Sequence, residues 1–403
     1  MFMVKRQLSV YLLDETLVVH ISGEHGGAVF GRYTLRQTYE EIKKKMSNLE
    51  QEIDKRNACS QIFKDNVRCL GSYVFEQIIR KDQDNGIDKL YSQHISPFLR
   101  EDESQLDISI SFTMDTGYLG LPIELMRDQD PMPVSARIPV YKRIVSPNLY
   151  RRRKELFEEK EKIKVLLISS NISLKQSDKV LMGNEDRPLG IYLPEVKELD
   201  SPDSEVNEIN KIIEEAKEKK GLDIEAEVLD SSRLDYESFM HEIALNKYDI
   251  IHYNGHGYYE EGKQGENTNS CIFIRKNKGS NDKIVAIRRD KLRTILGGRT
   301  RLKFVYLSSC QGGKSDQDFR MVSNNFVGLL DAIAFAGIPN VLGMRWSISP
   351  VDSKSLARNF YRALFLDDDH NTIEAALTKA RAETLDYNDQ SVWCSPVLVK
   401  QNL

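Results

Sequence analysis

Short apolar runs alternate with longer amphipathic segments from residue 163 onward, and this alternation constrains the fold more than any other feature of the chain. The apolar runs predict strands at 163–169, 223–229, 249–253, 271–275, 284–287, 303–308 and 339–345. The longer segments predict helices at 203–219, 233–246, 288–296, 324–336, 351–366 and 371–386. Strands that alternate with helices of this length form a largely parallel sheet sandwiched between helices. The sequence therefore predicts an α/β fold that carries its chemistry at the carboxyl edge of the sheet.

A different pattern precedes this body. The expected elements are hairpin strands at 7–13 and 16–22, turning at Asp14-Glu15, then helices at 36–56 and 65–80 and a strand at 106–113. No Gly-, Ser- or Pro-rich linker separates these elements from the rest of the chain. We therefore expect an N-terminal β-hairpin and helical region, residues 1–104, packed on a body formed by residues 105–403.

The composition describes an ordinary folded protein and excludes two classes of partner. The 403 residues include 57 Lys+Arg and 61 Asp+Glu, a formal net charge of −4, so no excess of basic residues favours nucleic acid. No apolar run approaches the roughly 20 residues that a membrane-spanning helix needs. We expect a cytoplasmic protein with no direct nucleic-acid or membrane partner.

The cysteines are few and scattered. Cys59, Cys69, Cys271, Cys310 and Cys394 form no Cys-x-x-Cys pair, which argues against a disulfide framework or a zinc site and for reduced thiols. We expect neither a metal nor another cofactor. Four of the five are interpreted as small buried apolar residues. Cys310 differs because it ends a predicted strand and two glycines follow closely.

Two segments combine an apolar strand with a glycine-bearing turn, namely 249–257 and 302–313. If these strands are neighbours, the turns bring His256 and Cys310 together. A cysteine nucleophile needs a base within hydrogen-bond reach, because a free thiol of pKa near 8.5 is only partly ionised at neutral pH. Gly257 lets the backbone approach a substrate, so its N–H is a candidate donor to a carbonyl oxygen. His252, four residues before His256, is interpreted as a core histidine and not as the base.

An ordered set of motifs resembles the CHAT family of caspase-like cysteine peptidases, over about residues 105–400. The motifs are Gly120-Leu-Pro-Ile-Glu-Leu-Met126, His252-Tyr-Asn-Gly-His-Gly257, Leu307-Ser-Ser-Cys-Gln-Gly312, the small-residue segment 326–337, Pro339-Asn-Val-Leu-Gly-Met-Arg-Trp346 and Ser391-Val-Trp-Cys-Ser-Pro-Val-Leu398. Ile123 stands where the family usually has Trp.

The resemblance implies a caspase-like fold, with a pseudo-caspase half at about 105–162 and a catalytic half at about 163–403. It also implies peptide-bond hydrolysis through a Cys310–His256 dyad. The oxyanion would be held by the backbone N–H groups of Gly257 and Cys310.

Specificity is expected to reside in two further residues. Asp352 lies in Trp346-Ser-Ile-Ser-Pro-Val-Asp352, which resembles a family segment whose acid can line a pocket for a basic side chain, although two extra residues interrupt the match. Asp352 is equally well placed to cap a helix beginning near Ser353. Gln311, directly after Cys310, is the second candidate substrate-binding residue.

Long polar segments at 171–202, 258–270 and 311–323 flank the expected site, and long loops in compact domains are often functional. We expect a protein substrate and an activating protein or complex that orders this region. The resemblance to the CHAT family implies regulated proteolysis in bacterial, including antiviral, defence.

Two other functions remain open from the sequence. Ser308-Ser-Cys-Gln-Gly-Gly-Lys-Ser315 nearly satisfies the phosphate-binding pattern G-x-x-x-x-G-K-[ST], with Ser308 in place of the first glycine. The alternative is a non-catalytic scaffold that retains the caspase fold for protein contacts.

Overall fold

A computed structural model describes most of the chain. The described residues are 4–13, 16–22, 27–32, 35–54, 58–80, 87–99, 106–144, 156, 162–173, 180–182, 185–188, 203–258, 270–278, 283–310, 327–346, 348–367, 372–387 and 389–401.

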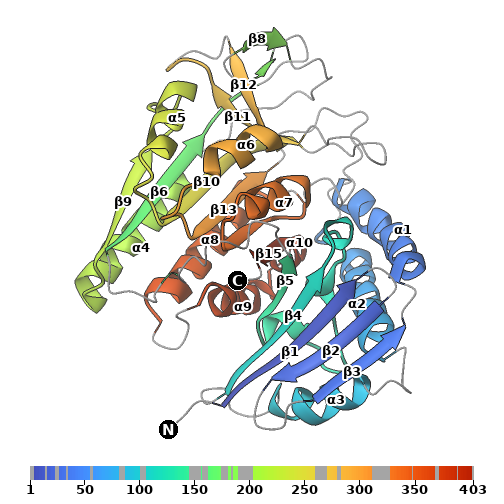
Figure 1. Cartoon of the computed structure of the whole chain (residues 1–403). Coiled ribbons are helices and arrows are strands. Elements are labelled where there is room, and N and C mark those ends of the chain that lie inside the picture. Colours follow the sequence, from blue (N-terminus) through green and yellow to red (C-terminus); the bar gives the residue numbers. More distant parts are fainter. Residues whose placement is uncertain are drawn as a thin grey trace.

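A long mixed sheet runs through the molecule (Figure 1). Its strands within the described residues are β1 (Val4–Leu13), β2 (Thr16–Ser22), β3 (Gly27–Arg32), β4 (Leu106–Met114), β5 (Val140–Ile144), β6 (Ile163–Ser170), β7 (Val180–Met182), β8 (Glu185–Pro188), β9 (Ile224–Leu229), β10 (Ile250–Tyr258), β11 (Cys271–Arg275), β12 (Ile284–Arg288), β13 (Phe304–Cys310), β14 (Asn340–Met344) and β15 (Pro396–Gln401). The main order is β3-β2-β1-β4-β5-β15-β14-β13-β10-β6-β9, and a branch β11-β12-β7-β8 leaves the end of β10. The neighbours β14, β13, β10, β6 and β9 are all parallel, so their carboxyl ends share one edge.

Helices cover both faces of the parallel part. The helices of the described residues are α1 (Leu35–Asp54), α2 (Gln61–Phe75), α3 (Ile87–His94), α4 (Ser204–Lys220), α5 (Tyr236–Ala244), α6 (Arg289–Leu296), α7 (Val327–Phe335), α8 (Pro350–Phe365), α9 (Ile373–Thr384) and α10 (Ser391–Cys394). Helices α4, α8 and α9 pack on one another over one face, and α5, α6 and α7 form the second layer. Phe304 and Tyr306 of β13 pack against the buried aromatic rings of α8, which fixes that helix to the sheet.

The structure confirms the predicted fold class and most of the predicted elements of the body. The hairpin at 7–13 and 16–22 is also confirmed, with Leu13 paired to Thr16. It does not form a separate small sheet, however, because β1 pairs in parallel with β4 along nine residues. The boundary expected at residue 104 therefore lies between two strands of one continuous sheet.

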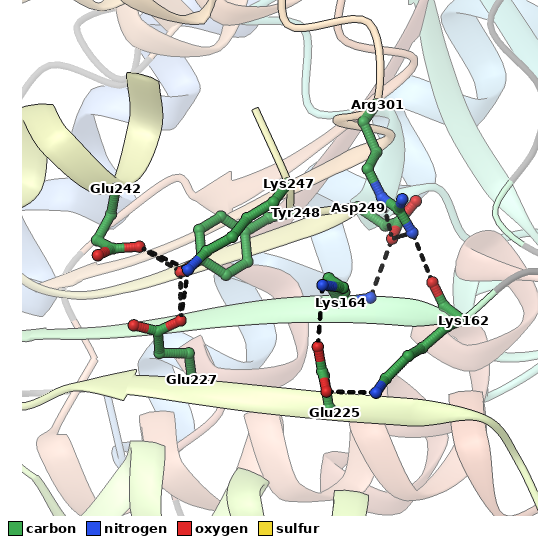
Figure 2. A network of polar contacts seen from close by, with 9 residues as sticks. All are labelled: Lys162, Lys164, Glu225, Glu227, Glu242, Lys247, Tyr248, Asp249 and Arg301. Carbon is green, nitrogen blue, oxygen red and sulfur yellow. Dashed lines mark hydrogen bonds and ion pairs between the residues drawn. The ribbon is translucent and has the colours of Figure 1, made fainter. Parts of the chain in front are cut away.

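Polar contacts at the amino edge of the parallel strands fix their register (Figure 2). The buried Asp249 carboxylate accepts hydrogen bonds from the backbone N–H of Lys164, at 2.9 Å, and from Nε of Arg301, at 3.0 Å. Its backbone also pairs with Lys164 on one side and with Lys303 on the other, each at 2.8 Å. Asp249 thus joins the starts of β6, β10 and β13. Because strands aligned at one edge remain aligned along their length, this contact also sets which residues meet at the opposite, carboxyl edge.

We expect Asp249→Asn to lower the free energy of unfolding by about 2 kcal/mol, because it weakens two hydrogen bonds to a buried charge. Urea unfolding of the full chain measures the change. Glu225→Gln is the matched control, since its ion pairs with Lys162 and Lys164 are largely exposed, with side chains 32–43% accessible. The control should change stability by less than about 1 kcal/mol. Equal losses in the two variants would show that Asp249 has no special role.

Candidate active site

His256 and Cys310 lie directly opposite each other on neighbouring parallel strands. The register of β10 with β13 runs from Ile250 paired with Phe304 to His256 paired with Cys310. Neighbouring strands are about 4.8 Å apart, so the two side chains start from adjacent backbone positions at the carboxyl edge. The prediction that these strands are neighbours is confirmed. The His256 side chain is fully buried.

The strands were predicted to end too early: β10 was expected to end at residue 253 and β13 at residue 308, but they extend to Tyr258 and Cys310. Residues 255–257 were expected to leave the sheet, but β10 continues to Tyr258. Each residue of this stretch has a strand partner: Gly255 pairs with Ser170 of β6, and Gly257 pairs with Ile272 of β11. His256 is consequently held by the sheet itself and not by a loop.

Tyr253 and Gly255 explain how the backbone is held at His256. The Tyr253 hydroxyl lies 3.0 Å from the carbonyl oxygens of both His256 and Phe273, and the Ser170 hydroxyl donates to Phe273 O at 2.7 Å. A Cβ on Gly255 would lie 2.7 Å from the Tyr253 hydroxyl and 2.8 Å from Cβ of Ser170. Only glycine leaves room for this close approach.

His252 is a buried histidine with both ring nitrogens in contact, as expected for a core residue. Its Nε2 lies 2.9 Å from Oε1 of Glu205, and its Nδ1 lies 3.2 Å from the Tyr361 hydroxyl. The ring also packs on Tyr306, with centroids 4.6 Å apart. The second oxygen of Glu205 accepts a hydrogen bond from Ser353, whose hydroxyl also contacts Ser308.

Asp352 does not cap its helix, so that alternative is wrong. The N-cap of α8 is Ser349, whose hydroxyl accepts from the backbone N–H of Asp352 at 3.1 Å and donates to Oδ2 of Asp352 at 2.6 Å. The helix begins at Pro350, one residue before the predicted start at 351 and three before Ser353, because proline suits the first helical position. Burial raises the pKa of the Asp352 carboxyl, Ser349 opposes the rise, and the charge of Asp389 adds to it.

Some of the predicted site residues are not described, or are described only in part. Gln311 and the segment 311–323 lie outside them, and Cys310 is described by its backbone alone. The backbone nevertheless bears on the phosphate-loop alternative. Ser308 and Cys310 are in ladder register with Asn254 and His256, whereas a phosphate-binding loop beginning at position 308 would have left the sheet there.

Sequence reasoning missed the polar residues around the strands: Glu205, Ser353, Tyr253 and Ser170. Tyr253 and Ser170 are ordinary strand residues in the sequence, and Glu205 is one of several acids in a helix. No local pattern marks them, because their partners come from distant segments.

Two general findings concern the part of the chain that the structure describes. No three His, Cys, Asp or Glu side chains there gather as metal binding requires. None of the helices there has the length and apolar character for crossing a bilayer.

Comparison with known proteins gives one family and several structures. The family model of the CHAT domain matches residues 86–400. No curated protein matches the chain. Two structures of the Saccharomyces cerevisiae separase–securin complex resemble it at 9% identity, with TM-scores of 0.45 and 0.49; each match covers 99% of this chain and 30% of the other. The Arg-specific cysteine proteinase gingipain R resembles it at 8% identity with a TM-score of 0.43, over 80% of this chain and 67% of the other.

Proposed function

Because the chain belongs to the CHAT domain family, we propose that it is a caspase-like cysteine endopeptidase whose catalytic dyad is His256 and Cys310. The observation that carries the proposal is the register pair of these two residues at the carboxyl edge of adjacent parallel strands. Imidazole and thiol are the two groups that this chemistry requires in contact.

The proposed reaction proceeds in two steps. The Cys310 thiolate attacks the scissile carbonyl carbon and forms a C–S bond, the C–N bond breaks, and His256 gives a proton to the departing amine. Water, deprotonated by His256, then hydrolyses the thioester and releases the thiol. We assign the oxyanion to the backbone N–H groups of Gly257 and Cys310, as donors of this kind typically contribute about 100- to 1000-fold in rate.

The test is to profile the new N-termini of a proteome incubated with the wild-type protein or with Cys310→Ala. Cleavages that appear with the wild type but not with Cys310→Ala support the proposal. The proteome is a lysate of the protein's own cells with the gene deleted, so that any activating partner is present. Identical sets of termini with the two proteins in this lysate would contradict a peptidase and favour the non-catalytic scaffold.

We also propose that a partner protein activates the enzyme. The support is the full burial of His256 in the isolated chain, since substrate reaches the imidazole only after the residues that cover it have moved. A separate assay tests this point: purified casein incubated with the protein alone should remain uncut. Rapid cleavage of casein would contradict activation by a partner.

The setting we propose is regulated proteolysis in the cytoplasm during bacterial antiviral defence, which is supported by the family alone. A phage challenge of cells that carry the wild type or Cys310→Ala tests it, and equal survival would contradict it.

Asp352 is our candidate for recognising a basic residue before the cut. It lies in the first turn of α8, directly before Ser353, which contacts β13 two residues from Cys310. Asp352→Asn should lower kcat/KM for peptides with Lys or Arg at this position about tenfold or more, since a hydrogen bond to a charged group is worth roughly 1.5–3 kcal/mol. A peptide library with varied residues before the cut measures the change.

The matched control is Asp290→Asn, which removes an exposed carboxylate from the first turn of α6. It should leave selectivity unchanged. If Asp352→Asn also leaves selectivity unchanged, Asp352 does not recognise the substrate.

A further inference from the structure

Glu205 lies at the centre of a buried polar network on the face of the sheet that α4 and α8 cover. The side chains of Glu205, His252, Ser308, Ser353 and Tyr361 are between 0% and 3% exposed. Glu205 Oε1 lies 2.9 Å from Nε2 of His252, and Oε2 accepts from the Ser353 hydroxyl at 2.9 Å. One carboxylate thus contacts both a strand of the sheet and the first turn of α8.

The number of available protons fixes the direction of each hydrogen bond. Ser353 has one hydroxyl proton, and the carboxylate of Glu205 only accepts, so Ser353 donates to Glu205. In the 2.6 Å contact between Ser308 and Ser353, Ser308 must therefore be the donor. Because the carboxylate only accepts, Nε2 of His252 donates to Glu205, while Nδ1 lies 3.2 Å from the Tyr361 hydroxyl. Glu205 is the final acceptor of both chains.

Each chain includes one residue on a strand that carries the proposed dyad. Ser308 is on β13, two residues before Cys310, and His252 is on β10, four residues before His256. At a rise of about 3.3 Å per residue these are distances of about 7 Å and 13 Å along the strands. A shift of Glu205, α4 or α8 is therefore transmitted to β10 and β13 close to the reacting groups.

We propose that Glu205 is a positioning residue of the peptidase site. Through Ser353 it holds β13 and the first turn of α8, through His252 it holds β10, and together these bonds set the spacing between Cys310 and His256. The inference rests on the proposed function, because it assigns Glu205 a role in the dyad's geometry and not in the reaction itself.

The experiment measures the pH dependence of alkylation of Cys310 by iodoacetamide in the full chain. Cys59 and Cys69 are exposed, so the interpretation of these two residues as buried is wrong, and peptide mass spectrometry is used to separate Cys310 from them. The variants are Ser353→Ala, Glu205→Leu and Glu205→Gln. Ser355→Ala is the matched control, because this hydroxyl donates to Val351 O within the same helix at 3.0 Å. Thermal melts verify that each variant is folded at the assay temperature.

We expect Ser353→Ala and Glu205→Leu to raise the apparent pKa of alkylation by about one unit, which is about a tenfold loss of rate below pH 7. Ser355→Ala should behave as the wild type. Glu205→Gln should also remain close to the wild type: its amide oxygen accepts from His252, its NH2 donates to Ser353, and Ser353 then donates to Ser308. This rescue distinguishes positioning from an effect of the negative charge, in which Gln would act as Leu does.

Failure of the inference and failure of the proposed function give different results. If His256→Ala leaves the alkylation profile of Cys310 unchanged, there is no dyad and the proposed function fails. If the profile depends on His256 but Ser353→Ala cannot be distinguished from Ser355→Ala, the dyad stands and Glu205 has no positioning role. A profile for Glu205→Gln that matches Glu205→Leu would likewise overturn the inference.

Discussion

Alanine at position 310 should lower kcat for peptide hydrolysis by a factor on the order of 10⁵ while the chain remains folded, because the variant lacks the nucleophile but keeps the rest of the site. The fold should tolerate the change, since the substitution removes one sulfur at the end of β13 and leaves the backbone ladder with β10 in place. Single-turnover hydrolysis of a substrate found by N-terminal profiling measures the loss, and far-UV circular dichroism verifies the fold.

Cys271→Ala is the matched control. Cys271 is fully buried in β11, and burial raises the pKa of its thiol, so it should be inert. Activity within a few-fold of the wild type is expected. A loss in Cys271→Ala as large as that in Cys310→Ala would mean that the assay reports stability and not chemistry.

His256→Ala should cost about as much as Cys310→Ala, and the double variant should cost no more than either single one. Residues that act as one unit are strongly non-additive, because removing either already abolishes the shared function. Additive losses in the double variant would show that the two residues act separately, and would contradict the proposed dyad.

The apolar pattern of the sequence predicts the strands that are rich in apolar residues better than the strands that are not. β6, β10, β13 and β14 each contain a short, mostly apolar run, which predicts a strand without any knowledge of its neighbours. β8 is Glu-Asp-Arg-Pro and, among the described residues, pairs with β7 alone, so its extended conformation follows from its neighbour and not from its own composition. The segment 171–202 was therefore expected to be irregular throughout.

The candidate site also has one part that local sequence patterns predict and another part that depends on distant contacts. The adjacency of His256 and Cys310 could be predicted because each follows an apolar run, and adjacent strands of a parallel sheet share an edge. Glu205 was not found, because its contacts lie 47 and 148 residues away in the sequence, at His252 and Ser353. Such buried contacts depend on how α4 and α8 approach the sheet, which periodicity within each helix does not specify.

Another large effect is expected at Glu124, which joins two of the motifs that resemble the CHAT family. Its Oε1 lies 3.1 Å from Nζ of Lys142, and its Oε2 accepts from Arg345 at 2.8 Å. The charge of Arg381 is also close enough to affect the Glu124 carboxyl. All four side chains are 2% exposed or less, so one carboxylate faces three cationic groups inside the protein.

The pKa shifts in this cluster have opposite physical origins. Burial would raise the pKa of Glu124, but Lys142, Arg345 and Arg381 together lower it, so the carboxylate remains charged. Burial lowers the pKa of Lys142 to about 7, with Glu124 opposing the change. Between that value and the ordinary lysine pKa of about 10.4, the unfolded chain binds more protons than the folded one, so the stability contributed by this group rises with pH.

Replacing the anion should therefore cost far more than replacing one of the cations. Glu124→Gln leaves the buried guanidinium groups without their carboxylate and should lower the free energy of unfolding by about 3–5 kcal/mol. Lys142→Met keeps Glu124 paired with Arg345 and should change stability by no more than about 1 kcal/mol at pH 7. It should also remove a stabilisation of about 2 kcal/mol that the wild type gains between pH 7 and pH 9. Urea unfolding at pH 7 and pH 9 measures the two losses of stability and the gain with pH. Equal losses in Glu124→Gln and Lys142→Met would contradict this account of the cluster. An unchanged pH dependence in Lys142→Met would contradict it as well.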